Sequence, residues 1–228
     1  MKRFYKDVAV TPERGLTLDG RAVRTPARAL LTLPNDALAE AVADEWRAQG
    51  EEIDPRSMPM TGLANAAIDR VAPDPAAFAA PLSAYAESEL LCYRAEEPPE
   101  LAARQEAVWG PILDWARGRY DVSFTLVTGI MHQPQPPQTL TRLADAVSAR
   151  SIWELAALNP MISISGSLVI ALAVLESAVQ PEAAFAAAHL DEIWQAELWG
   201  EDDWALDARA VRERDFLNAC HFAGLAKG

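Results

Sequence analysis

The stretch GLTLDGRAVRTPARALLTLPNDALAEAVADEWRAQG, residues 15–50, decides the fold class because its hydrophobic period changes midway. Its first half contains short alternating or β-branched apolar runs, and Asp19-Gly20 between two of them favours a tight hairpin. Its second half has helical spacing, with Leu38, Val42, Glu45 and Trp46 on one stripe. The stretch therefore predicts short strands followed by a helix.

The remainder of the chain is predicted to be almost entirely helical from Thr61 onward. The proline-broken segment EEIDPRSMPM, residues 51–60, separates it from the β-rich part. We therefore predict an α+β protein. A small β-rich N-terminal domain with one helix is expected over 1–57, and a larger helical domain over 58–228.

The C-terminal part is expected to hold helices over 138–158, 160–178, 181–199 and 205–223. A break is expected at Asn159-Pro160, and a kink at Gly110-Pro111. The apolar run LVIALAVL is far shorter than the ~20 residues that cross a bilayer, so it predicts a buried central helix. The loop HQPQPPQ, residues 132–138, is expected to be a connector, with a contact site as the alternative.

Composition excludes several classes of function. The net charge of −13 disfavours nucleic acid and anionic membrane surfaces as partners and suits a basic protein face. The two cysteines are far apart and the three histidines are scattered singly, so we predict no disulfide, no metal site and no cofactor. Cys220 beside His221 comes nearest to a metal-binding pair, but on an apolar terminal helix we expect it to serve packing. The N-terminus MKRFYKDVAV has no apolar leader or presequence pattern, and we expect a cytoplasmic protein without membrane insertion.

Catalytic motifs are also missing from the sequence. It contains no phosphate-binding loop, dinucleotide fingerprint or nucleophile elbow, and SISGS at 163–167 lacks the required spacing. We predict no enzyme and no catalytic residue. A small-molecule enzyme with converging carboxylates stays open as an alternative, because the many acidic residues supply such pairs by chance.

The segment DEIWQAELWGEDDWALD, residues 191–207, combines three tryptophans with seven acids and no lysine or arginine. On a helix from Leu190, Glu192, Gln195 and Trp199 share a polar stripe, while Glu197 falls among apolar residues. Such exceptions to patterning concentrate at functional sites, and a tryptophan rimmed by acids suits a basic protein partner. In the simpler alternative, Trp199 folds back onto the body, and Glu197 either extends its carboxylate to solvent or pairs with an arginine of the last helix.

Several blocks carry a family resemblance: RFYK (3–6), LDGRAVRTPA (18–27), MPMTGLANAAID (58–69), YAESELLCYRAE (85–96) and LDEIWQAELWGEDDWALD (190–207). In their order and spacing the chain resembles the assembly chaperones that hold the alpha subunit of the ATP synthase catalytic head. The resemblance implies a β-rich N-terminal part, a larger helical part and no nucleotide hydrolysis by the chaperone.

The resemblance also assigns candidate partner-binding residues. They are Glu192, Gln195, Trp199, Gly200, Asp203, Asp207 and Glu89. Asp203 stands where the family pattern has glutamate, and Leu206 stands where it has histidine, so no role of that histidine transfers to this chain.

The function implied by the resemblance is to bind the unassembled alpha subunit and to cover its interface until the beta subunit takes its place. Such a cover reduces aggregation of exposed apolar surface. We expect a monomeric chaperone. The alternatives are the carboxylate enzyme and an acidic helical adaptor for another basic protein.

Overall fold

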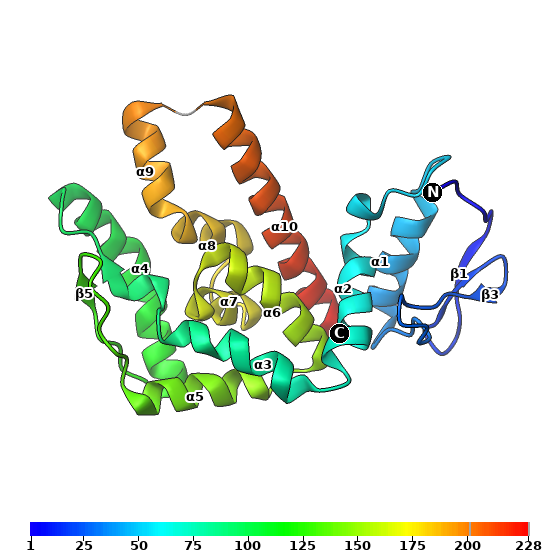
Figure 1. The fold of residues 1–228 in the computed structure, drawn as a ribbon, viewed down its shortest axis with the longest axis horizontal. Helices are drawn as coiled ribbons and strands as arrows, with labels where there is room; N and C mark the ends of the chain where they lie inside the picture. Colours follow the sequence, from blue (N-terminus) through cyan, green and yellow to red (C-terminus); the bar gives the residue numbers. More distant parts are fainter. Residues whose placement is uncertain (201, 228) are drawn as a thin grey trace. The chain divides into compact units, whose positions relative to one another are not determined.

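The computed structural model describes residues 1–200 and 202–227, and it divides into two compact units. Unit 1 contains Met1–Phe78, Ser151–Ala157 and Asn218–Gly228, and unit 2 contains Ala79–Arg150 and Leu158–Leu217. Both units are described separately below, and Figure 1 gives the labels of their elements.

Unit 1 contains an antiparallel sheet in the order β1 (Val8–Val10), β2 (Leu16–Leu18) and β3 (Arg21–Ala22). Between β2 and β3, Asp19 has φ 48° and Gly20 has φ 76°. Positive φ at both central residues is the geometry of the tight hairpin turn that matches strand twist, and Asp-Gly favours it. The predicted hairpin is confirmed, with Leu18 opposite Arg21.

Two helices of unit 1 follow the sheet: α1 (Asp36–Arg47) and α2 (Pro59–Ala66). Asn35 begins α1, because its side chain accepts a hydrogen bond from the Leu38 amide at 2.9 Å. Glu45 lies on α1 and accepts from the amides of Met60 at 2.6 Å and Thr61 at 2.7 Å. This carboxylate satisfies amide groups at the start of α2, which explains why an acid lies on the apolar stripe of α1.

Unit 2 is built from helices. Its elements are α4 (Pro99–Tyr120), α5 (Pro137–Ser148), α7 (Leu168–Leu175), α8 (Pro181–Ala188), α9 (Leu190–Trp199) and the parallel pair β4 (Tyr93–Arg94) and β5 (Val127–Thr128). The helices α3 (Pro75–Ser83), α6 (Ile152–Ser165) and α10 (Asp203–Lys227) contribute residues to both units. Short helical turns complete the chain at Pro55–Ser57, Ala67–Val71, Ala84–Ala86 and Leu90–Cys92.

The centre of unit 2 is α7, and all eight of its residues are buried, as predicted for LVIALAVL. Glu89 is 0% exposed and lies at the start of this helix. Its carboxyl group accepts hydrogen bonds from the Ser167 hydroxyl, from the Val169 amide at 3.1 Å and from the Leu91 amide at 3.3 Å. Burial raises the pKa of Glu89 from 4.5 to about 7, against the opposing effect of these donors.

Several expected helix boundaries are wrong. The expected helix over 138–158 is interrupted between α5 and α6, and the expected break at Pro160 lies inside α6. The helix expected over 160–178 is instead divided at Gly166, whose φ of 67° ends α6 and suits glycine. The helix expected over 181–199 is likewise two helices that meet at His189.

The predicted α+β fold class is confirmed: a small β-rich N-terminal part precedes a larger helical part. The strand-like segment VSFTLVTG, residues 122–129, contains only the two-residue strand β5, and the segment ARALLTL, residues 27–33, forms only isolated bridges. The domain boundary after residue 57 stays a prediction. Among the described residues, no helix is both long enough and apolar enough to cross a bilayer, and Cys92 and Cys220 are not joined in a disulfide.

Candidate partner-binding surface

The helix α9 is held at its base by α4. The Gln105 amide donates to Asp191 at 2.8 Å, and the buried Trp109 indole donates to the Ala187 carbonyl at 2.8 Å. Both contacts join α4 to the chain just before or within the first turn of α9. These two hydrogen bonds fix the position of the first turn of α9, and the last turns of the helix extend away from them.

Glu192 is engaged inside the protein. One nitrogen of Arg212 on α10 donates to both of its carboxylate oxygens at 2.7 Å, and Arg209 lies 4.0 Å away. The side chain of Glu192 is 39% exposed. Glu192 therefore ties α9 to α10, and one face of its carboxylate still meets solvent.

The apolar position taken by Glu197 is explained by Arg104 on α4. Arg104 donates to Glu197 at 2.9 Å, and its guanidinium also lies over the Trp194 ring, 5.6 Å from the centroid. The hydrogen bond from Arg104 lowers the pKa of Glu197. The alternative that Glu197 pairs with an arginine is thus right in kind, although the arginine belongs to α4 and not to the last helix.

The end of α9 is set by Gly200, whose φ of 79° suits glycine and whose amide donates to the Ala196 carbonyl at 2.9 Å. After a short connection, Asp202 starts α10 by accepting from the Ala205 amide at 2.8 Å. In Figure 1, α9 and the first turns of α10 reach a common end of unit 2.

Large apolar side chains are left in solvent at this end: Leu198 is 56% exposed, Trp199 78%, Trp204 83% and Leu206 43%. The acids Asp202, Asp203 and Asp207 are exposed beside them. We call these residues, together with Gly200, the tip surface. Trp199 does not fold back onto the body, so the simpler alternative for this residue is wrong.

The candidate residues are distributed unevenly. Trp199, Gly200, Asp203 and Asp207 belong to the tip surface, and Gln195 is exposed on α9 without a hydrogen bond among the described residues. Glu192 lies nearer the base of α9 and is partly neutralised by Arg212. Glu89 lies apart from them, and a side chain that solvent does not reach offers a partner nothing to contact.

The sequence interpretation missed Leu198, Trp204, Leu206 and the capping role of Asp202. Trp204 is the third tryptophan of the acidic segment. Because it follows the break at Gly200, the helical spacing of residues 190–199 does not predict on which face it lies. Leu206 was noted only for the histidine it replaces. Its exposure makes it an apolar member of the surface.

Comparisons with known proteins point to the same family as the sequence blocks. The sequence model described as ATP12 chaperone protein matches residues 2–117, which is half of the chain. The chain belongs to the ATP12 chaperone family. A curated relative of this ATP12 chaperone, "Protein atp12, mitochondrial" from Schizosaccharomyces pombe, is 25% identical over 232 residues, covering 95% of this chain and 79% of the relative.

Solved structures of ATP12 proteins have the same fold. Atp12 from Paracoccus denitrificans is 37% identical, has a TM-score of 0.94, and the match covers 99% of this chain and 98% of that one. The Atu1473 protein of Agrobacterium tumefaciens is 44% identical with a TM-score of 0.91, over 98% of this chain and 85% of that one. The likeness therefore extends through unit 2, beyond the segment that the family model matches.

Proposed function

We propose that this chaperone of ATP synthase assembly binds the unassembled alpha subunit through the tip surface and shields its interface until the beta subunit replaces it. The observation that carries the proposal is the exposure of Trp199 and Trp204 among carboxylates. Exposed tryptophans are frequent energetic anchors of protein interfaces. Membership of the ATP12 chaperone family supports a chaperone role for the protein as a whole.

The physical requirements of a temporary cover fit this surface. An unassembled ring subunit exposes apolar area that promotes aggregation, so the cover must contact apolar side chains. The cover must also be displaceable, which favours a few anchors over a large apolar interface. Two indoles and two leucines with an acidic rim meet both requirements, and the acids favour a basic rim on the client.

The carboxylate-enzyme alternative gains no support from the surroundings of Glu89 and Glu192. The hydrogen-bond partners of Glu89 are a serine hydroxyl and backbone amides, and those of Glu192 belong to an arginine. Neither acid has a second carboxyl group among its described partners. The tip surface is better suited to a macromolecular partner.

The double substitution Trp199→Ser and Trp204→Ser is expected to weaken binding of isolated alpha subunit at least tenfold, because it removes both apolar anchors. Both side chains are exposed, so the free energy of unfolding should change little. Binding is measured by titration of labelled alpha subunit, and chaperone activity by light scattering of alpha subunit kept at an aggregating temperature. Ile130→Ser is the matched control, since Ile130 is 94% exposed and does not belong to the tip surface. Equal binding and protection by the double variant and this control would refute the proposed surface.

The acidic rim is tested separately by Asp207→Lys. This exposed aspartate has no ion pair among the described residues, whereas a lysine at position 192 would face Arg212 and disturb the α9–α10 link. We expect severalfold weaker binding of alpha subunit at low salt and a difference that shrinks toward 0.5 M salt as the charges are screened. A salt-independent affinity of the wild-type protein, with no effect of Asp207→Lys, would show that the rim does not contribute.

A further inference from the structure

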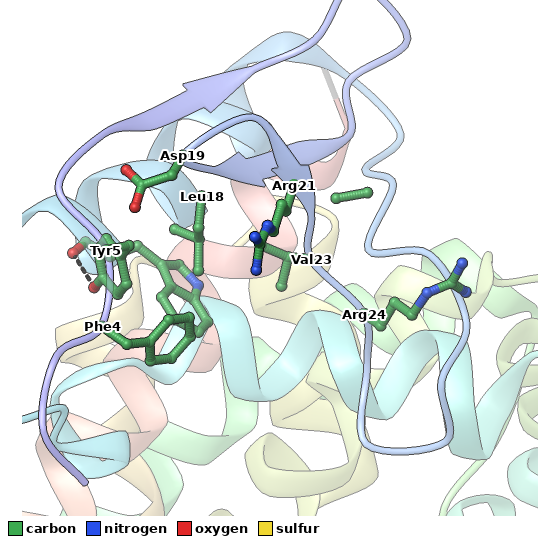
Figure 2. A pocket seen from close by; sticks show the side chains of 9 residues that line it. Phe4, Tyr5, Leu18, Asp19, Arg21, Val23 and Arg24 are labelled. Atoms are coloured by element: carbon green, nitrogen blue, oxygen red, sulfur yellow. Dashed lines mark hydrogen bonds between the residues drawn. The ribbon is translucent and has the colours of Figure 1, made fainter.

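A hollow of about 500 Å³ lies in unit 1, beside the β2–β3 hairpin and α1. Its inner wall includes Leu18, Tyr5, Val23 and Trp46, which belong to the small core of this unit or pack against it. The Tyr5 hydroxyl donates to the Trp46 carbonyl at 2.7 Å and fixes this wall (Figure 2). The hollow thus reaches an apolar, ordered surface.

The rim of the hollow carries a large apolar side chain in solvent. Phe4 is 64% exposed, although its neighbour Tyr5 is only 5% exposed. Figure 2 shows Leu18, Arg21 and Val23 extending from the hairpin toward the rings of Phe4 and Tyr5. An apolar group placed between Phe4 and the inner wall would bury surface on both of its sides.

The charge available to a ligand here is positive. The one acid of the lining, Asp19, already accepts from the amides of Lys6 at 3.0 Å and Asp7 at 2.8 Å. Arg21 makes no hydrogen bond or ion pair among the described residues, and Arg24 uses only one nitrogen, on the Arg28 carbonyl at 2.8 Å. The lining of this hollow contains two arginines and one aspartate, a net charge of +1 in a chain whose total is −13.

The shape of the site favours an extended ligand. A second hollow of about 760 Å³ shares Phe4, Tyr5 and Asp19 with the first, and we call the two adjoining hollows the trough. The second lining adds three bases, Lys2, Arg3 and Lys6, and two acids, Glu51 and Glu52, so the bases of the trough still outnumber its acids. A trough with apolar pockets and a rim charge resembles the sites that take alternate side chains of an extended peptide. Two arginines are too few for a nucleic acid backbone, and the charge of the whole chain opposes one.

We propose that this trough binds an acidic peptide segment of another polypeptide, with an aromatic or branched apolar side chain beside Phe4 and a carboxylate on Arg21. The proposal is independent of the tip surface, because the two sites share no residue. It adds a basic docking site to a protein whose other candidate surface is acidic.

The probe is a fluorescein-labelled synthetic peptide, Gly-Ser-Asp-Phe-Glu-Leu-Asp-Ser-Gly, titrated with the full-length protein and followed by fluorescence anisotropy. One matched peptide replaces its three acids by lysine, and another replaces Phe and Leu by serine. We expect saturable binding of the first peptide and at least tenfold weaker binding of both others. Failure of the first peptide to bind at 1 mM protein, or equal binding of the serine peptide, would overturn the proposal.

Arg21→Glu is expected to weaken binding of the acidic peptide at least tenfold. The matched control is Arg56→Glu, which makes the same charge change in unit 1 at a side chain that is 92% exposed and lines neither hollow. It should change the affinity less than twofold. An equal loss of affinity in both variants would show that only the overall charge of the protein matters, and it would contradict the proposed site.

Two further measurements locate the ligand and define its class. Amide chemical-shift changes in the ¹⁵N-labelled protein are expected at residues 4–6 and 18–24, and changes confined to other residues would contradict the site. Phe4→Ser should weaken binding without lowering the melting temperature, since Phe4 is mostly in solvent. Displacement of the peptide by an equal concentration of ATP, with the same dependence on Arg21, would assign the trough to a small anion instead.

Discussion

Replacing Glu89 by alanine is expected to lower the free energy of unfolding by about 2–5 kcal/mol, because it removes the acceptor shared by several buried donors and truncates a fully buried side chain. The substitution leaves the Ser167 hydroxyl and the Val169 and Leu91 amides buried without their acceptor. It also leaves a cavity at the first turn of α7. Chemical denaturation measures the loss. Glu87→Ala, at an exposed position two residues away, is the control and should change stability by less than about 0.5 kcal/mol.

The same residue gives stability a dependence on pH. The pKa of Glu89 is about 7 in the folded protein and 4.5 in the reference state, so the folded protein binds the additional proton. The contribution of Glu89 to the free energy of unfolding is therefore fully present below pH 4.5 and is lost as the pH rises through 7. This change amounts to about 3 kcal/mol. Glu89→Gln should remove this slope between pH 5 and 8. A slope that persists unchanged in the glutamine variant would contradict the assignment.

Replacing Glu176 by alanine is expected to cost about 2–3 kcal/mol, because three side chains from two other segments of unit 2 converge on this carboxylate. It accepts hydrogen bonds from Arg150 at 2.6 Å, from Tyr120 at 2.8 Å and from Arg119. The side chains of Glu176 and Arg150 are only 15% and 16% exposed, so solvent replaces little of the lost interaction. The exposed Glu182→Ala serves as the control in the same denaturation experiment.

The pH dependence of Glu176 has the opposite sign. Burial alone raises its pKa, but the hydrogen bonds from Arg119, Arg150 and Tyr120 outweigh burial and lower the pKa from 4.5 to about 2. The stabilisation is present above pH 4.5 and is lost as the pH falls toward 2, by up to about 3 kcal/mol. The free energy of unfolding of the Glu176→Gln variant should therefore change less than that of the wild type as the pH falls toward 2. Identical acid unfolding of wild type and variant would refute the prediction.

The parts of the fold that the sequence predicted correctly are those that local chemistry determines. Asp19-Gly20 requires no distant partner to form its turn, and the apolar run of α7 is buried in almost any compact arrangement. The helix boundaries failed where tertiary packing overrides local preference. Pro160 lies within α6, and Gly166, which stands inside a mostly apolar, uncharged stretch, ends that helix instead.

The candidate surface was predictable in part for a similar reason. The placement of Trp199 and Glu192 on one helix follows from spacing, but their separate environments depend on α4 and α10. Arg212 lies twenty residues from Glu192, and Arg104 ninety-three from Glu197. Neither pairing leaves a signal in the sequence. Glu89 shows the same limit, since nothing local distinguishes a buried acid from an exposed one.

The position of Glu89 has a consequence for the order in which unit 2 forms. Ser167 caps α7 locally by accepting from the Ile170 amide at 2.9 Å, but Glu89, which accepts from the Val169 amide, is 78 positions from Ser167. This second part of the cap therefore exists only after a long loop has closed. The most buried helix of the unit therefore lacks a complete N-terminus until distant segments have met. Amide exchange in the first turn of α7 should accordingly slow late in refolding, together with that of residues near 89.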